Sequence, residues 1–192
     1  GEISMELMSR SPTNFRIGIT QMLAARDERV IRQRIWLNRY GGSLISFCIN
    51  MPGEIKDNAE AHQLQAAGIL AVKKELKARG WVTSAHSSWR YITGPEAFWS
   101  IPVPAETLKS AMITLEQQHP LGRLFDLDVL GADARSISRR QFDLPARQCL
   151  ICNEPAAVCG RSRRHSSQEL LTHIRQTLQD YSTQEKHYVC TV

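Results

Sequence analysis

The sequence lacks any hydrophobic run that approaches the ~18 residues needed to cross a membrane. Its first ten residues include Glu2 and Glu6 and show no basic stretch followed by an apolar one, so we expect no signal peptide. These absences predict a cytoplasmic protein. With 192 residues, of which 42% are hydrophobic and 22% charged, the chain is expected to fold as one globular domain rather than remain disordered.

The glycine-rich signatures of the common nucleotide-binding folds are also missing. The sequence contains no P-loop, no Rossmann fingerprint, no G-x-S-x-G element and no internal repeat. Any phosphate site in this chain must therefore be built from other residues.

Acidic residues are scarce in one long stretch of the chain. Between Arg135 and Arg164 only Asp143 and Glu154 are acidic, against seven arginines and no lysine, so this stretch carries a net charge of +5, equal to that of the whole chain. Guanidinium groups bind phosphate in a bidentate manner, which predicts a phosphorylated ligand, nucleic acid or an acidic protein as partner, with a solubilising surface as the alternative. The seven are Arg135, Arg139, Arg140, Arg147, Arg161, Arg163 and Arg164.

Hydrophobic periodicity predicts four helices. On the first, Leu23, Ile31 and Ile35 have helical spacing, while Arg26 and Arg29 fall on a neighbouring polar stripe. The four predicted helices cover residues 20–39, 58–79, 104–118 and 166–181.

Two of these helices carry the signature of a capping box, Asp57 with Glu60 and Ser166 with Glu169. Strands are expected at residues 43–50, 81–93, 98–103, 123–130 and 136–142, the last two paired as a hairpin through Gly131. This order predicts an α+β fold, with a mixed or antiparallel sheet and flanking helices. We expect a loose arm over residues 1–18, a single domain over 19–182 and a tail over 183–192.

The clearest chemical motif is the run from Gly122 and Arg123 to Asp126 and Asp128. Because alternate side chains of a strand share a face, both carboxylates are expected to point the same way. Adjacent carboxylates repel each other unless a cation neutralises them, and their oxygens suit Mg²⁺. The motif therefore predicts a magnesium site beside an arginine that can bind phosphate, with a solvated polar strand as the alternative.

Five cysteines, an odd number, argue against a framework of disulfides. Three of them, Cys149, Cys152 and Cys159, precede His165, and together these four residues form a complete set of Zn²⁺ ligands. The intervals after Cys152 match no common zinc finger, so reduced cysteines filling a small core are the alternative.

Two further residues have both a chemical and a structural interpretation. His119, just before the Gly-Arg turn, could act as a general base or stabilise the turn. Lys56, after Pro52-Gly53, could bind phosphate or belong to the loop.

Several blocks of the sequence resemble one enzyme family. Over about residues 23–178 the chain is similar to the holo-citrate lyase synthases, also called apo-citrate lyase phosphoribosyl-dephospho-CoA transferases. The blocks, in order, are RDER at 26–29, LISF at 44–47, PGEIK at 52–56, GPE at 94–96, Glu116 with HPLGRLFDLDV at 119–129, SRR at 138–140, LP at 144–145 and the stretch 149–165.

The resemblance implies a nucleotidyltransferase-like catalytic domain. Such an enzyme transfers phosphoribosyl-dephospho-CoA from triphosphoribosyl-dephospho-CoA to a serine of the citrate lyase acyl carrier protein and releases diphosphate. It implies that Asp126 and Asp128 are catalytic and hold Mg²⁺, and that Arg123 stabilises the reacting phosphoryl group. The expected substrate-binding residues are Gly122, Arg26, Lys56, Arg139, Arg140, Arg147, Arg161, Arg163 and Arg164.

One position departs from the family pattern, because relatives often carry an acid where this chain has Gln141. A third metal carboxylate is therefore unassigned, and Glu116 and Asp143 are the remaining candidates. Two other functions fit the same residues: a non-enzymatic, zinc-stabilised basic module that binds nucleic acid, or the same transfer onto a carrier of the malonate decarboxylase type.

Overall fold

A computed structural model describes residues 10–189 of the chain, with side chains for residues 10–185. Residues 1–9 of the predicted arm and residues 190–192 of the predicted tail lie outside this range. The elements are α2 (Ile19–Tyr40), β1 (Ser43–Ile49), α3 (Ala59–Ala78), β2 (Ala85–Tyr91), β3 (Gly94–Ile101), α4 (Ala105–Gln118), η1 (Gly122–Leu124), β4 (Phe125–Leu130), η2 (Arg139–Phe142), α5 (Ala156–Ser162) and α6 (Ser167–Val189).

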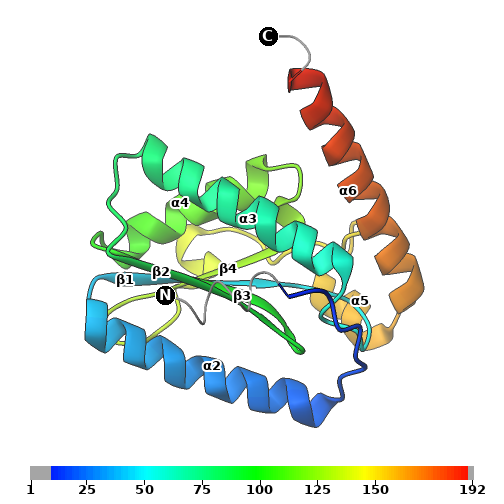
Figure 1. Cartoon of the computed structure of the whole chain (residues 1–192), viewed down its shortest axis with the longest axis horizontal. Helices are drawn as coiled ribbons and strands as arrows, with labels where there is room; N and C mark the ends of the chain where they lie inside the picture. Colours follow the sequence, from blue (N-terminus) through cyan, green and yellow to red (C-terminus); the bar gives the residue numbers. More distant parts are fainter. Residues whose placement is uncertain (1–9, 190–192) are drawn as a thin grey trace.

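The four strands form one antiparallel sheet in the order β2-β3-β1-β4, so β4 lies at an edge. α2 runs along one face of the sheet and α3 and α4 cover the other, while α5 and α6 lie at one end (Figure 1). This single α+β domain confirms the fold class predicted from the sequence. None of the helices within residues 10–189 combines the length and apolar composition needed to span a bilayer.

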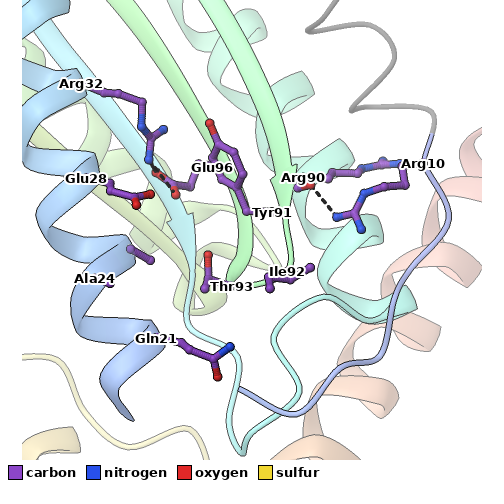
Figure 2. A pocket seen from close by; sticks show the side chains of 11 residues that line it. Arg10, Gln21, Ala24, Glu28, Arg32, Arg90, Tyr91, Ile92, Thr93 and Glu96 are labelled. Carbon is purple, nitrogen blue, oxygen red and sulfur yellow. Dashed lines mark hydrogen bonds and ion pairs between the residues drawn. The ribbon is translucent and has the colours of Figure 1, made fainter. Parts of the chain in front are cut away.

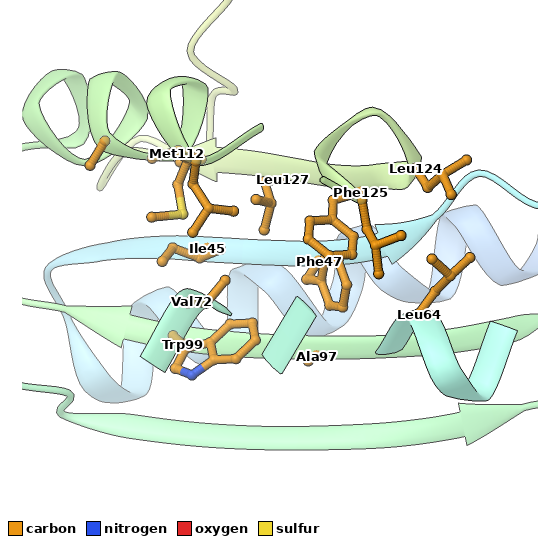
Figure 3. Close-up of a cluster of buried hydrophobic side chains, with 14 of the residues drawn as sticks. Ile45, Phe47, Leu64, Val72, Ala97, Trp99, Met112, Leu124, Phe125 and Leu127 are labelled. Atoms are coloured by element: carbon orange, nitrogen blue, oxygen red, sulfur yellow. The ribbon is translucent and has the colours of Figure 1, made fainter. Parts of the chain in front are cut away.

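The main hydrophobic core lies between the sheet and α3, α4 and α6. Alternate strand residues supply it, and Phe47, Trp99 and Leu127 point from three strands into one cluster (Figure 3). Gly68 lets α3 approach this cluster closely, because a Cβ there would lie 2.3 Å from Cζ of Phe47.

The polar stripe of α2 faces the sheet, whereas its aliphatic stripe faces solvent. Gln33 is buried and donates to Oγ of Ser46 at 3.0 Å, and Arg29 donates to Oε1 of Glu96 at 2.9 Å. Since Glu96 is only 2% exposed, its charge requires cationic partners, and this requirement orients the helix. The aliphatic side chains remain largely exposed, at 54% for Leu23, 57% for Ile31 and 55% for Ile35.

The predicted capping box of Asp57 with Glu60 is wrong. Asn58 is the residue that caps α3, because its side chain accepts the backbone N–H of the first turn at 2.8 Å. Asp57 is buried instead and accepts hydrogen bonds from Arg10 and from the Thr13 hydroxyl. Residues 10–18 of the predicted arm thus contact the domain through this carboxylate.

The predicted strand over 136–142 is also wrong. Only one isolated bridge, between Leu130 and Ser136, continues from β4, and the chain then turns into η2. Ser138 closes this turn because its backbone N–H donates to Oε1 of Gln141 at 3.0 Å. The side chain at the position that departs from the family pattern therefore serves a local cap.

Two further predictions concern the residues at which β3 and α6 begin. Gly94 begins β3, so the turn at Ile92 and Thr93 falls inside the strand predicted over 81–93, and the strand predicted over 98–103 begins four residues earlier. The capping box before α6 is confirmed, because Ser166 and Glu169 bond to each other's backbone N–H at 2.7 and 3.1 Å.

Candidate active site

Asp126 and Asp128 project from edge strand β4 on the face that α2 covers. Their strand partners in β1 are Cys48 and Ser46, and Ser46 is the residue that Gln33 of α2 contacts. The intervening positions of β4 are buried on the opposite face. The strand therefore places both carboxylates on one face, as its alternation predicts.

The two carboxylates affect each other. The pKa of Asp128 is raised to about 6, first because surrounding protein atoms desolvate its carboxylate and second because the charge of Asp126 lies beside it. Such a pair of oxygen donors matches the preference of Mg²⁺ for carboxylate ligands, and a cation bound there would relieve the repulsion.

Arg29 of α2 links this carboxylate pair to the centre of the sheet. Its guanidinium pairs with Glu96 at 2.9 Å and is close enough to Asp126 for the two charges to interact. Arg26 lies one helical turn earlier on the same side, with an exposed side chain. Sequence reasoning missed the role of Arg29, although residues 25, 29, 33 and 37 form the four-residue spacing of the inward face.

Side chains, and not a fifth strand, form hydrogen bonds with several backbone groups at the open edge of β4. The backbone N–H of Leu127 donates to Glu116 at 3.2 Å, and its carbonyl accepts from Nζ of Lys109 at 2.9 Å. The carbonyl of Phe125 accepts from Arg147 at 2.9 Å. The edge is thereby protected from further pairing, and charged groups gather beside the carboxylate pair.

Glu116 is the centre of this charged cluster. It is 5% exposed and forms ion pairs with Arg139, at 3.1 Å, and with Arg147. Its oxygens are thus paired with arginines and with the strand edge, and its role as a third metal ligand stays a prediction. Burial also lowers the pKa of the neighbouring Lys109.

The Gly-Arg pair before β4 forms the 3-10 turn η1, so the strand begins at Phe125 and not at Arg123 as predicted. Arg123 is exposed, and its pKa is lowered by partial burial and by the neighbouring charges of Arg147 and Arg139. The three arginines are therefore close enough for their charges to repel one another, an arrangement suited to an anionic ligand.

Two cavities adjoin this arginine cluster. One of about 310 Å³ is lined by Arg123, Arg139 and Arg147. A larger one of about 610 Å³ is lined by Arg123, Arg147 and Arg163, by the loop at Gly53 and by the start of α6. Arg123 lies between the two and lines both.

The remaining predicted substrate contacts occupy other places. Nζ of Lys56 donates to the carbonyl of Met51 at 2.6 Å, so this lysine closes its own loop. Arg140, Arg161 and Arg164 are exposed and do not line either of these cavities.

His119 has a structural role in the turn before β4. Its Nδ1 accepts the backbone N–H of Leu121 at 3.0 Å, and its ring packs against Phe125 and Tyr181. Burial lowers the pKa of His119, which keeps the imidazole neutral and able to accept this bond.

The three cysteines and the histidine of the second motif come together. The Sγ atoms of Cys149, Cys152 and Cys159 and a ring nitrogen of His165 all lie within 4.8 Å of one another. This cluster borders the larger cavity, because Cys149, Cys159 and His165 are among its lining residues.

A separate cavity of about 520 Å³ lies between α2 and the turn from β2 to β3 (Figure 2). Its central cation, Arg32, reaches both oxygens of Glu96 at 3.2 Å and stacks 4.9 Å from the ring centre of Tyr91. These contacts make Arg32 part of the packing of α2 on the sheet, two strands away from Asp126.

Gly122→Ala is expected to destabilise the protein by about 3 kcal/mol. A Cβ at this position would lie 2.0 Å from the carbonyl oxygen of Glu116, and a backbone atom cannot move aside without disturbing α4. Urea unfolding of the purified variant measures the change. Gly160→Ala is the control, because a Cβ there meets nothing within 4 Å and alanine is the better helix former by about 0.5–1 kcal/mol. Equal stability of the two variants would contradict this role of Gly122.

Comparison with known proteins gives a consistent result. A family model for apo-citrate lyase phosphoribosyl-dephospho-CoA transferase matches residues 17–181. The transferase of that name from Citrobacter koseri is 40% identical over 176 residues, which cover 92% of this chain and 96% of that protein. A probable transferase of the same name from Vibrio cholerae is 43% identical over 176 residues, 91% of this chain and 98% of its own length. The transferase of that name from Escherichia coli is 38% identical over 176 residues, which cover 92% of this chain and 96% of that protein.

Proposed function

Because the chain belongs to the family of apo-citrate lyase phosphoribosyl-dephospho-CoA transferases, and is an enzyme of that kind, we propose that its substrates are triphosphoribosyl-dephospho-CoA and the acyl carrier protein of citrate lyase. The non-enzymatic alternative considered for the sequence does not stand, since the family model and the relatives described above are all named as transferases.

The proposed reaction is an attack of a carrier serine on the triphosphate. The serine hydroxyl oxygen forms a bond to the phosphorus nearest the ribose, the bond from this phosphorus to the bridging oxygen breaks, and diphosphate leaves. The hydroxyl proton is released. Catalysis of such a transfer depends mainly on the position of the reacting groups and on compensation of the charge that develops on oxygen.

Asp126 and Asp128 are proposed to hold a Mg²⁺ ion, which when bound would offset the negative charge of the triphosphate and of the departing diphosphate. Their shared face on β4 supports this assignment, and so does the pKa of Asp128, which is raised first by desolvation and second by the charge of Asp126. Arg29 limits the net negative charge of this face from the side of α2.

The arginines at the edge of β4 are proposed to bind the phosphates. Arg123 lines both cavities and would contact the phosphoryl group under attack. Glu116 holds Arg139 and Arg147 in place, and Arg163 reaches the same cavity as Arg147 from the end of α5. Gly122 permits the turn that carries Arg123 and itself lines the smaller cavity, where its backbone would adjoin the phosphates.

Five of the basic residues named from the sequence lie outside this cluster. Arg26 is exposed on α2, one helical turn before Arg29, and Lys56 donates to the carbonyl of Met51 in its own loop. The exposed Arg140, Arg161 and Arg164 are available to the dephospho-CoA phosphate or to an acidic carrier surface.

The observation that carries the proposal is that an edge strand bears paired carboxylates and has an arginine cluster beside it, in a chain of this family. The test is intact-mass spectrometry of the carrier protein after incubation with this enzyme, Mg²⁺ and triphosphoribosyl-dephospho-CoA. We expect a mass increase equal to one phosphoribosyl-dephospho-CoA group, with an equal amount of diphosphate released.

Two matched reactions sharpen this test. A citrate lyase carrier with alanine in place of the acceptor serine should stay unmodified, and a carrier of the malonate decarboxylase type should react far more slowly. An unmodified citrate lyase carrier would overturn the proposed reaction, and faster modification of the other carrier would reassign the partner.

A further inference from the structure

The segment that precedes α6 is built as a loop followed by a short helix. The loop carries Cys149 and Cys152, and its two ends are bonded together: the Cys149 N–H donates to the carbonyl of Glu154 at 2.7 Å, and the Ala156 N–H donates to that of Arg147 at 2.8 Å. A tight loop with two cysteines three positions apart presents both thiols to the same side.

The helix and the turn after it bring the other two side chains to this loop. Cys159 projects from α5 and is 7% exposed, and His165 follows a left-handed turn at Arg163, whose φ is 49°. The Sγ atoms of Cys152 and Cys159 are 3.5 Å apart, and Nε2 of His165 lies 3.3 Å from Sγ of Cys152.

We propose that Cys149, Cys152, Cys159 and His165 bind one Zn²⁺ ion. Tetrahedral zinc with bonds of about 2.3 Å to sulfur requires its ligand atoms to be about 3.8 Å apart, and the four atoms here all lie within 4.8 Å of one another. Three thiolates and one imidazole complete the coordination, so the ion has no open position and its role is structural.

The composition of the segment supports a metal rather than a small core of reduced thiols. Within the described stretch 143–165, Cys159 is the only buried residue, so this stretch has no apolar interior of its own. Segments with too little core usually depend on a metal or a disulfide for their conformation. The backbone N–H of Ile151 also points at Sγ of Cys149, 3.5 Å away, as a donor that supports a thiolate ligand.

The zinc ion would determine where two arginines of the candidate site lie. Arg147 is joined to the loop that carries Cys149, and Arg163 lies between Cys159 and His165. This consequence rests on the proposed function, whereas the metal site itself does not.

Metal analysis of the protein purified under reducing conditions, with zinc supplied during growth, tests the site. We expect about one zinc per chain in the unmodified protein and less than about a tenth of that in Cys152→Ser or Cys159→Ser. The controls are Cys48→Ser, at the sheet, and His173→Asn, on the exposed side of α6, and both should retain the ion. A zinc-free unmodified protein, or zinc retained by Cys152→Ser and Cys159→Ser, would overturn the proposal.

Cobalt substitution of the unmodified protein provides a measurement that does not depend on any variant being folded. We expect the intense visible bands of tetrahedral cobalt with thiolate ligands, and their absence would also overturn the site. Removal of the metal with a chelator should expose the chain to trypsin at Arg161, Arg163 and Arg164, with the sheet left intact. The zinc site would be contradicted by unchanged cleavage after chelation or by a disulfide between Cys152 and Cys159 in the purified protein. Neither result would bear on the transfer reaction.

Discussion

Asp126→Asn and Asp128→Asn are each expected to lower the rate of transfer to the carrier protein by about 10³-fold or more. Each substitution removes a charged ligand from the proposed magnesium site, which corresponds to the loss of about 4 kcal/mol of transition-state stabilisation. Initial rates of carrier modification, followed by mass spectrometry over a range of Mg²⁺ concentrations, measure the effect. Asp180→Asn, on the exposed side of α6, is the control and should retain the full rate.

Asp128→Asn is expected to gain stability while it loses activity. The folded-state pKa of Asp128, about 6, lies above the ordinary aspartate value of 3.8, so its ionisation destabilises the folded protein as pH rises from about 4 to above 6. Asparagine removes this destabilisation. The melting temperature of Asp128→Asn should therefore exceed that of the unmodified protein at pH 7–8, and the difference should vanish near pH 4.

Added Mg²⁺ extends the same test. A cation bound between the carboxylates should raise the melting temperature of the unmodified protein at pH 7–8 but not that of Asp128→Asn. Full transfer activity in both asparagine variants would remove the basis for a metal site on β4. If the melting temperatures of Asp128→Asn and of the unmodified protein change with pH in the same way, ionisation of Asp128 does not destabilise the folded protein.

Glu116→Ala is expected to destabilise the protein by about 3 kcal/mol and to lower the melting temperature by roughly 10 °C. The carboxylate is almost fully buried, and its removal leaves Arg139, Arg147 and the backbone N–H of Leu127 without their shared acceptor. Loss of one partner from a buried ion pair costs more than the pair itself contributes, because the remaining charges stay desolvated. Urea and thermal unfolding measure the change.

Two other variants, one at position 116 and one elsewhere on α4, serve as comparisons for this prediction. Glu116→Gln retains an acceptor for the Leu127 N–H but not the charge, so its loss of stability should lie between those of the unmodified protein and Glu116→Ala. Glu106→Ala, exposed in the first turn of α4, should change stability by less than about 1 kcal/mol. Equal effects of the substitutions at 106 and 116 would show that Glu116 does not organise the arginine cluster.

Local rules were sufficient for several parts of this protein. The alternation of a β-strand alone places Asp126 and Asp128 on one face, and the pair Ser166 and Glu169 alone begins α6. Both depend on backbone geometry within a few residues, which the order of residue types specifies. The spacing of cysteines and histidine likewise identified a set of side chains that the fold brings together.

Long-range burial decided the rest. The aliphatic stripe of α2 predicts that this side would face the core, yet the buried charge of Glu96 turns the side with Arg29 inward. The residues around Arg29 do not indicate that Glu96 packs against this helix, because Glu96 lies 67 positions away from Arg29 in the sequence. Distant residues also decide the role of Asp57. Its position before α3 is typical of a helix cap, but its buried carboxylate accepts hydrogen bonds from Arg10 and Thr13 instead.

The sequence by itself determined the α+β fold, the family, the carboxylate pair and an excess of arginine in one stretch. Only the tertiary structure decided that Arg123, Arg139 and Arg147 gather at the edge of β4, and that Glu116 binds two of these arginines. The physical reason is that an edge strand leaves backbone groups unpaired, and that a buried carboxylate is stable only beside cations. Residues distant in the chain supply the partners in both cases.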